Sequence, residues 1–154
     1  MDTTTNRETL QQVMTEYYEA FNAKDRQRVL GVFSENCEFV DLTMGRNMKG
    51  HEQLSAFMTE TWRLSPFFKI EPIETLFDGG RAAVRLTMSG APKIDADGTP
   101  KAGHLWSIPS TSFFRFEAGK ICWKADCWNM LAIPKQVGWL KMLPNLIRAN
   151  RKPK

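Results

Sequence analysis

Residues 105–130 read LWSIPSTSFFRFEAGKICWKADCWNM, and apolar and polar side chains alternate on both sides of a short EAGK segment. Alternation with a period of two is typical of β-strands, and a glycine-containing segment between two such runs favours a tight turn. We therefore predict a long strand over residues 105–116 and a last strand over 121–130. One face of the long strand is apolar at its ends and hydroxylated in its middle, and it comprises Trp106, Ile108, Ser110, Ser112, Phe114 and Phe116.

A second hairpin precedes this pair of strands. Residues 67–77 and 81–89 flank Asp78, Gly79 and Gly80, a combination that is a strong hairpin signal. A polar loop over residues 90–103, which contains prolines and glycines, connects this hairpin to the long strand. The second half of the chain is thus predicted to be an antiparallel meander.

The first half of the chain carries helical patterns. Apolar residues recur at helical spacing over residues 8–23, and they are Leu10, Val13, Met14, Tyr17 and Phe21. Asp25 is expected to cap a short second helix, whose inner face would include Phe33. A strand over residues 37–42, a loop between Gly45 and Gly50, and a third helix over residues 51–63 follow. Helices first and a meander afterwards predict an α+β fold.

Length and charge favour one small domain. The 154 residues carry a formal charge of +4, and we expect a single domain over 1–154 with a core at about 8–133. Residues 134–154 form a C-terminal extension with a basic end, in which a short helix could close the barrel mouth or pack on a partner chain. Because the basic residues gather in this tail, no nucleic-acid partner is expected.

The cysteines and the ends of the chain bear on compartment and metal binding. Cys37, Cys122 and Cys127 are three in number and lack metal-ligand spacing, which argues against both a disulfide framework and a metal site. A reducing compartment fits this usage. No signal peptide, membrane span or nucleotide motif is visible, so we expect a cytoplasmic protein with no membrane contact and no cofactor.

Three stretches resemble the NTF2-like superfamily. The segment YYEAFNAKD at 17–25 resembles the end of its first helix, and GHEQLSAF at 50–57 resembles the start of its third. Residues 119–138 resemble the last strand and tail of the SnoaL-like polyketide cyclases. The order of elements agrees over residues 8–140. The resemblance implies a conical half-barrel, with N-terminal helices packed on a strongly bent antiparallel sheet that encloses an apolar pocket.

Three residues are candidates for catalysis. Asp126 lies mid-strand among apolar neighbours, where a carboxyl group suits general acid or base work, and its position matches the catalytic Asp of SnoaL-like cyclases. The alternative is that Asp126 faces outward and pairs with Lys124 or a loop arginine. Asp41 resembles in position the general base of the ketosteroid isomerases, but an Asp at a strand end is also a common turn residue. Tyr17 resembles their oxyanion-holding tyrosine, or it is a core residue.

Two departures from related enzymes bear on the reaction. The ketosteroid isomerases complete their oxyanion hole with a protonated acid, and the matching position here is Ser112, a weaker donor. The limonene-epoxide hydrolases carry an Arg and an Asp two residues apart on a strand, whereas this chain has Arg85 followed by Leu86 and Thr87. Steroid isomerisation and epoxide hydrolysis are therefore each incompletely supported.

Aromatic residues are predicted to form the walls of the pocket. With Ser112, the candidate substrate-binding residues are Trp106, Trp128, Phe39, Trp62 and His104. The alternative is that these side chains belong to an ordinary core and a dimer interface. His51, which begins the third helix, could be a capping or surface residue.

These observations lead to a functional hypothesis. We expect a cofactor-independent acid/base enzyme that acts on a hydrophobic small molecule (polyketide, terpenoid or steroid-like) by cyclisation or isomerisation. An epoxide hydrolase, a non-catalytic small-molecule carrier, and a subunit that pairs with a catalytic partner are the alternatives. A homodimer is expected, since the fold leaves an apolar sheet face.

Overall fold

The computed structural model describes residues 7–91, 96–98 and 105–138. The helices are α1 (Arg7–Asn22), α2 (Arg26–Val32), α3 (Gly50–Leu64) and α4 (Ala132–Gln136). The strands are β1 (Phe33–Asp41), β2 (Arg46–Lys49), β3 (Lys69–Asp78), β4 (Arg81–Gly90), β5 (Trp106–Glu117) and β6 (Lys120–Trp128). The predicted order of helices and strands is confirmed, except that β2 was not predicted; this and two further differences are described below.

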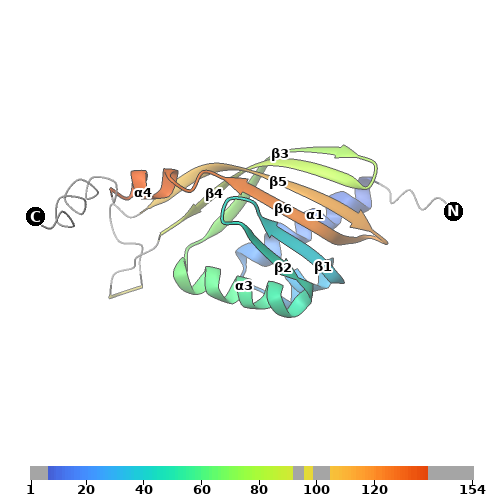
Figure 1. The fold of residues 1–154 in the computed structure, drawn as a ribbon, viewed down its shortest axis with the longest axis horizontal. Helices are drawn as coiled ribbons and strands as arrows, with labels where there is room; N and C mark the ends of the chain where they lie inside the picture. The colour runs from blue at the N-terminus through green and yellow to red at the C-terminus, as the bar shows by residue number, and fades with distance from the viewer. Residues whose placement is uncertain (1–6, 92–95, 99–104, 139–154) are drawn as a thin grey trace, which may run out of the picture.

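The strands form one curved sheet in the order β2-β1-β6-β5-β4-β3. Figure 1 shows α1 and α3 on one side of this sheet, which is therefore its covered, concave face. The fold is the predicted α+β half-barrel. The expectation of a purely antiparallel sheet was wrong at one place, because β1 and β6 pair in parallel. A parallel pair needs a long crossover connection, and α3 with the strands β2 to β5 supplies it.

Two local predictions were also wrong. Strand β2 was expected to be loop, but it pairs antiparallel with β1 and places Arg46 opposite Asp41. Its sequence RNMK buries only Met48, so it lacks the alternation that would have indicated a strand. Phe33 was assigned to the second helix, yet it is the first residue of β1. A short helix was predicted in the C-terminal extension. The structure shows helix α4 at its start, and residues beyond 138 lie outside the described residues.

The core lies between α1 and the sheet. The predicted inner stripe of α1 is buried at Leu10, Met14, Tyr17 and Phe21. The Tyr17 ring meets Phe114 of β5 with centroids 6.0 Å apart. Every second residue of β5 is buried from Trp106 to Phe116, as the alternation predicted. The concave face therefore supplies both the packing of α1 and the inward side chains described below.

Gly90 allows one wall residue to approach the backbone. It pairs with Trp106 across the β4–β5 ladder. A Cβ atom at this position would lie 2.5 Å from Ser65 Oγ and 2.7 Å from the Trp106 ring. Glycine at position 90 therefore leaves room for the Trp106 ring, which any larger residue would overlap. None of the helices in the described part of the chain is long and apolar enough to cross a membrane.

Candidate active site

A cavity of about 270 Å³ opens between the concave face of the sheet, α1 and α3. This volume is just below the usual range for ligand sites, which runs from roughly 300 to 1,000 Å³. Most of its wall is apolar, and its aromatic side chains are Phe21, Phe39, Phe57, Phe68, Trp106 and Trp128. The polar groups on its wall are few, and they include Tyr17, Asp41, Arg46 and Asp126. Such a cavity fits a hydrophobic molecule with a small number of polar atoms.

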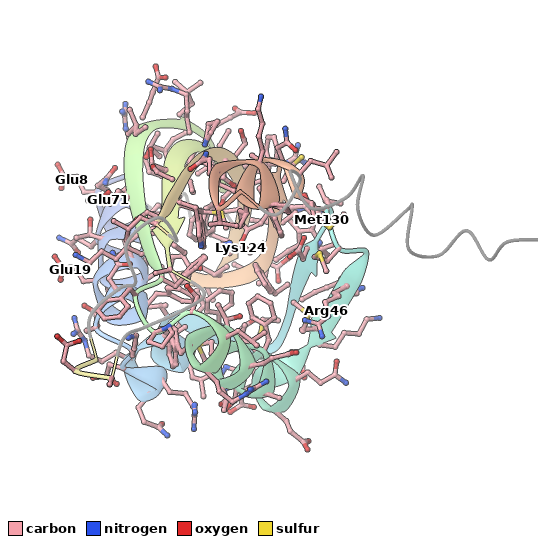
Figure 2. The ribbon with its side chains drawn as sticks, turned by 90° about the vertical axis from the view of Figure 1, so that its left-hand side faces the viewer. Glu8, Glu19, Arg46, Glu71, Lys124 and Met130 are labelled. Carbon is pink, nitrogen blue, oxygen red and sulfur yellow. The ribbon has the colours of Figure 1, made fainter. Side chains whose placement is uncertain are left out.

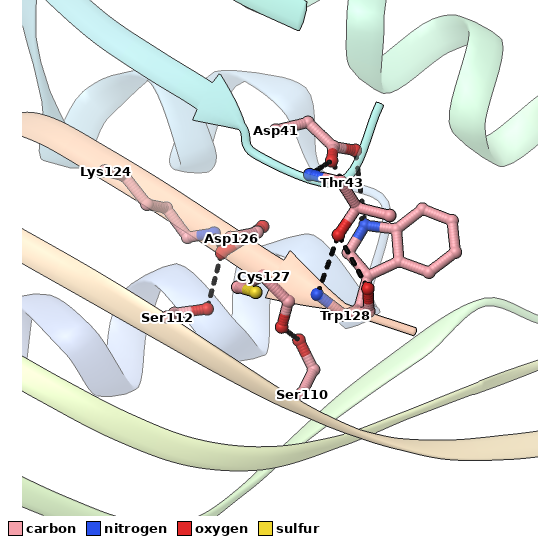
Figure 3. A network of polar contacts seen from close by, with 8 residues as sticks. All are labelled: Asp41, Thr43, Ser110, Ser112, Lys124, Asp126, Cys127 and Trp128. Carbon is pink, nitrogen blue, oxygen red and sulfur yellow. Dashed lines mark hydrogen bonds and ion pairs between the residues drawn. The ribbon is translucent and has the colours of Figure 1, made fainter. Parts of the chain in front are cut away.

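Asp126 is the polar group at the middle of the β6 wall. The side chain is 15% exposed, and it points into the cavity beside Ser112, its partner across the β5–β6 ladder. The Ser112 hydroxyl donates to Asp126 Oδ1 at 2.5 Å, and the Lys124 ammonium contacts the same oxygen. Figure 3 shows the three side chains together. Among the described residues, none donates to Oδ2, which leaves that oxygen for a ligand.

Lys124 is a site residue that sequence reasoning missed. We considered a Lys124–Asp126 pair only for an outward-facing Asp126, whereas the structure places both side chains inward. Lys124 is 1% exposed, and Figure 2 shows it near the centre of the molecule. Burial lowers the pKa of its ammonium, and the neighbouring Asp126 carboxylate partly opposes that shift. The strand period of two, which puts residues 124, 126 and 128 on one face, could have revealed it.

Asp41 also lines the cavity, but its oxygens are occupied. Its Oδ1 accepts hydrogen bonds from the backbone N–H groups of Thr43 and Met44 at 3.0 and 2.9 Å. The Trp128 indole N–H lies 3.2 Å from Oδ1 and 3.3 Å from Oδ2. The Thr43 hydroxyl forms a second link between the same two segments, because it donates to the Trp128 carbonyl at 2.7 Å. Asp41 thus joins the turn after β1 to the end of β6.

Two adjacent tyrosines of α1 lie near Asp126. Tyr17 is buried on the cavity wall, and burial together with the Asp126 carboxylate raises the pKa of its phenol well above the ordinary value. Tyr18, which was not predicted as a site residue, is buried too, and the same causes raise the pKa of its phenol. The Tyr18 hydroxyl has no hydrogen-bond partner among the described residues. Both phenols are therefore neutral donors at ordinary pH.

The remaining predicted site residues either line the cavity, pack outside its lining, or lie outside the described residues. Phe39, Trp106 and Trp128 line the cavity. Ser112 lies behind Asp126, and Trp62 packs on Phe21 of α1, with ring centroids 5.4 Å apart, outside the lining of the cavity. His104 lies outside the described residues. His51 places Nε2 3.2 Å from the Phe33 carbonyl oxygen, which ties α3 to β1.

Arg46 is a further lining residue that the sequence did not indicate. It was missed because β2 was taken for a loop. Its guanidinium forms an ion pair with Glu60 of α3 at 3.1 Å, and its side chain is 47% exposed. Arg46 therefore marks the solvent side of the cavity. No three His, Cys, Asp or Glu side chains within the described ranges come together in the manner of a metal site.

Comparisons with known proteins agree with this architecture. The SnoaL-like domain family matches residues 14–123, and the match therefore ends just before Lys124 and Asp126. No curated protein matches the sequence.

Three solved structures share the fold. A protein with a ketosteroid isomerase-like fold from Catenulispora acidiphila, solved in complex with trimethylamine, is 18% identical to this chain. The match covers 82% of this chain and 92% of that protein, with a TM-score of 0.72. IdmH from Streptomyces antibioticus, provisionally a polyketide cyclase, is 18% identical with coverages of 84% and 98% and a TM-score of 0.72. A provisional SnoaL-like polyketide cyclase from Shewanella denitrificans is 17% identical with coverages of 86% and 99% and the same TM-score, 0.72.

Proposed function

Since the chain belongs to the SnoaL-like domain family, we propose that it is a cofactor-independent enzyme that transfers a proton on a hydrophobic small molecule. Family membership supports a cyclase- or isomerase-like role. We propose that the reaction is a cyclisation or isomerisation that begins with removal of a proton from carbon. The observation that carries this proposal is the Asp126 carboxylate in the wall of an aromatic cavity. One of its oxygens is held, and the other accepts no hydrogen bond from the described residues.

The geometry of Asp126 supports the role of a general base. A base must reach the proton that it removes and must keep one direction of approach. Ser112 and Lys124 fix Oδ1, so the acceptor left for the substrate is Oδ2. In the proposed step, Oδ2 takes a proton from a carbon next to a carbonyl group, and the electrons of the C–H bond pass to the carbonyl oxygen.

The other candidates take supporting roles in this proposal. Ser112 donates to Asp126, so the task of holding the substrate oxygen goes to the Tyr17 phenol on the cavity wall. Asp41 is proposed to position Trp128 and the turn after β1. The size of the cavity, about 270 Å³, favours a substrate of one or two rings. A limonene-epoxide-hydrolase role gains no support, since Arg85 is 58% exposed and paired with Glu74.

A general probe can test the base without knowledge of the natural substrate. 5-Nitrobenzisoxazole is a small aromatic carbon acid, and removal of its ring proton breaks the N–O bond to give a coloured cyanophenolate. Loss of a general base commonly costs about 10²- to 10⁴-fold in rate. We expect Asp126→Asn to lose kcat/KM for this probe by that factor, while Asp78→Asn, an exposed hairpin residue, keeps the wild-type value.

Binding must be followed in the same variants. Trp106 and Trp128 line the cavity, so quenching of tryptophan fluorescence reports occupancy by the probe. Binding without turnover in the wild type, or equal turnover by the wild type and Asp126→Asn, would contradict the proposal. The first of these results would instead indicate a small-molecule carrier.

We also propose that two copies pair through the outer face of the sheet. A groove on this face is lined by Leu76, Ala83, Phe113, Arg115 and Trp123. Leu76 and Phe113 are 65% and 44% exposed, and clustered exposed apolar side chains mark interaction surfaces. The Arg115 guanidinium stacks 4.3 Å above the Trp123 ring, which adds a flat, weakly hydrated surface to the groove.

A further inference from the structure

Lys124 is a buried cation in a place where the fold does not require one. Its ammonium lies over three aromatic rings, 4.4 Å from the centroid of Phe39, 5.4 Å from that of Phe114 and 5.5 Å from that of Tyr17. Its ion-pair partner in the described part of the chain is Asp126. Figures 2 and 3 show the side chain at the centre of the molecule, directed along β6 toward that carboxylate.

Stability alone is a poor reason for such a pair. Taking two charges out of water is costly, and replacement of a buried ion pair by apolar residues of similar volume is often neutral or stabilising. The surrounding rings would accept a methionine or leucine at position 124. A buried cation that contacts a carboxylate on the cavity wall therefore points to a role in the chemistry of the cavity.

We infer that Lys124 is a positioning residue that holds Asp126 ready to remove a proton and supplies the positive charge that balances the anion formed from the substrate. This inference rests on the proposed function and deepens it. Lys124 and Ser112 both engage Oδ1, so rotation of the carboxylate would break two contacts at once. Oδ2, which accepts no hydrogen bond from the described residues, is then the oxygen left for the substrate.

The charge of the site stays constant through the proposed step. Before it, the Lys124 ammonium and the Asp126 carboxylate compensate each other. When Oδ2 takes the proton of the substrate C–H bond, Asp126 becomes neutral and the electron pair of that bond leaves an enolate on the substrate. The ammonium then compensates the enolate across a cavity of low polarity, where charges interact strongly. Return of the proton to another carbon restores the first pair.

This arrangement also accounts for Ser112. A single hydroxyl is a weak substitute for the neutral acid that would otherwise stabilise an oxyanion, and here that hydroxyl is turned toward Asp126. The cation two residues before Asp126 on the same strand face supplies the missing stabilisation. The other ionisable groups near this pair are Tyr17 and Tyr18 from α1 and Asp41 from β1.

Binding of 4-nitrophenolate tests the inference without any turnover. The phenolate resembles an enolate, and Asp126→Asn imitates the protonated aspartate that follows proton removal. We expect Asp126→Asn to bind 4-nitrophenolate at least tenfold more tightly than the double variant Lys124→Met/Asp126→Asn, which removes both charges and so leaves no unpaired buried ion. Neutral 4-nitrotoluene should bind the two variants equally. Lys69→Met combined with Asp126→Asn is the matched control, because Lys69 is exposed on β3.

Equal affinities of the two variants for the phenolate would overturn the inference. A second readout is the split between kcat and KM for 5-nitrobenzisoxazole in Lys124→Met. We expect kcat to fall by about tenfold or more, because the charge that develops in the transition state loses its counter-charge, while KM for this neutral probe stays near the wild-type value. An unchanged kcat in a folded, less stable variant would show a merely structural lysine. If phenolate affinity depends on Lys124 while the wild type turns over no carbon acid, the proposed function fails and the anion site remains.

Discussion

The two carboxylates of the cavity differ in which of their oxygens the protein already uses. Asp41 accepts two backbone N–H groups on Oδ1, and the Trp128 indole N–H bridges both of its oxygens. Asp126 keeps Oδ2 unengaged by the described residues. Because a base needs a free lone pair aimed at the substrate, this difference assigns the two residues to different tasks although both lie on the same wall.

This assignment predicts a contrast between two substitutions. Asp41→Asn retains an oxygen that can accept the turn N–H groups, so kcat/KM for 5-nitrobenzisoxazole should fall by less than about tenfold, whereas loss of a general base costs about 100-fold or more. The measurement is the initial rate of cyanophenolate release by Asp41→Asn and Asp126→Asn at equal protein concentration. A larger loss in Asp41→Asn than in Asp126→Asn would reverse the roles.

The buried phenols predict an alkaline loss of stability. Tyr17 and Tyr18 are the two tyrosines of the chain, and burial raises the pKa of both in the folded protein above the ordinary value of 10.0. The folded state thus holds protons that the unfolded state releases above pH 10. The stabilisation is complete below that pH and decreases above it, by about 1.4 kcal/mol for each pH unit and each tyrosine.

Urea unfolding between pH 9 and 11.5 checks this prediction. Tyr18→Phe removes one of the two phenols, and the Tyr18 hydroxyl has no described partner to lose. Its free energy of unfolding should therefore fall less steeply with pH than that of the wild type, while lysines and cysteines contribute equally to both proteins. Identical slopes would mean that Tyr18 ionises normally in the folded state.

At the scale of elements, the contact between β4 and β5 fixes one wall of the cavity. Gly90 allows Trp106 to lie against β4, where a Cβ atom would overlap the indole and Ser65 Oγ. Overpacking of a filled site costs typically about 1–3 kcal/mol. We expect Gly90→Ala to destabilise the protein by that amount and to weaken binding of 4-nitrotoluene, because the displaced indole enters the cavity.

A second glycine provides the comparison. Gly31 lies within helix α2, and a Cβ atom there would meet nothing within 4 Å. Gly31→Ala should stabilise the protein by about 0.5–1 kcal/mol through helix propensity alone. Thermal unfolding of both variants measures the contrast, and a neutral Gly90→Ala would show that Trp106 can move without cost.

At the scale of the whole molecule, the sheet has one covered face and one exposed face. Helices α1 and α3 cover the concave side (Figure 1), whereas Phe113 and Leu76 remain exposed on the other. The proposed dimer would cover these residues. A charge at the centre of such a surface opposes association, since it must lose its hydration without gaining a partner.

The dimer is tested by size-exclusion chromatography with light scattering. The wild type should have twice the mass of the chain, and Phe113→Asp should have the mass of one chain with an unchanged circular dichroism spectrum. Leu105→Asp serves as the control, because Leu105 is 61% exposed but lies outside the groove. A monomeric wild type would refute pairing through this face.

The sequence by itself determined the elements whose patterns are local. The helical stripe of α1 and the two-residue alternation of β5 are set by side chains a few positions apart, and local propensity and burial agree along each of them. Strand β2 lacked such a pattern, since only Met48 is buried in it. For the same reason Arg46 was not foreseen as a lining residue.

Only the tertiary structure decided which side chains meet. The parallel pairing of β1 with β6 joins segments from the two halves of the chain and places Asp41 beside Asp126 in register. That register cannot be predicted from the spacing of residues along the sequence, because the pairing of distant strands depends on the crossover between them. Alternation could indicate that Lys124 and Asp126 share a face. That this face is the covered one, which turns a surface ion pair into a buried one beside a cavity, follows from the curvature of the sheet and from the helices packed on it.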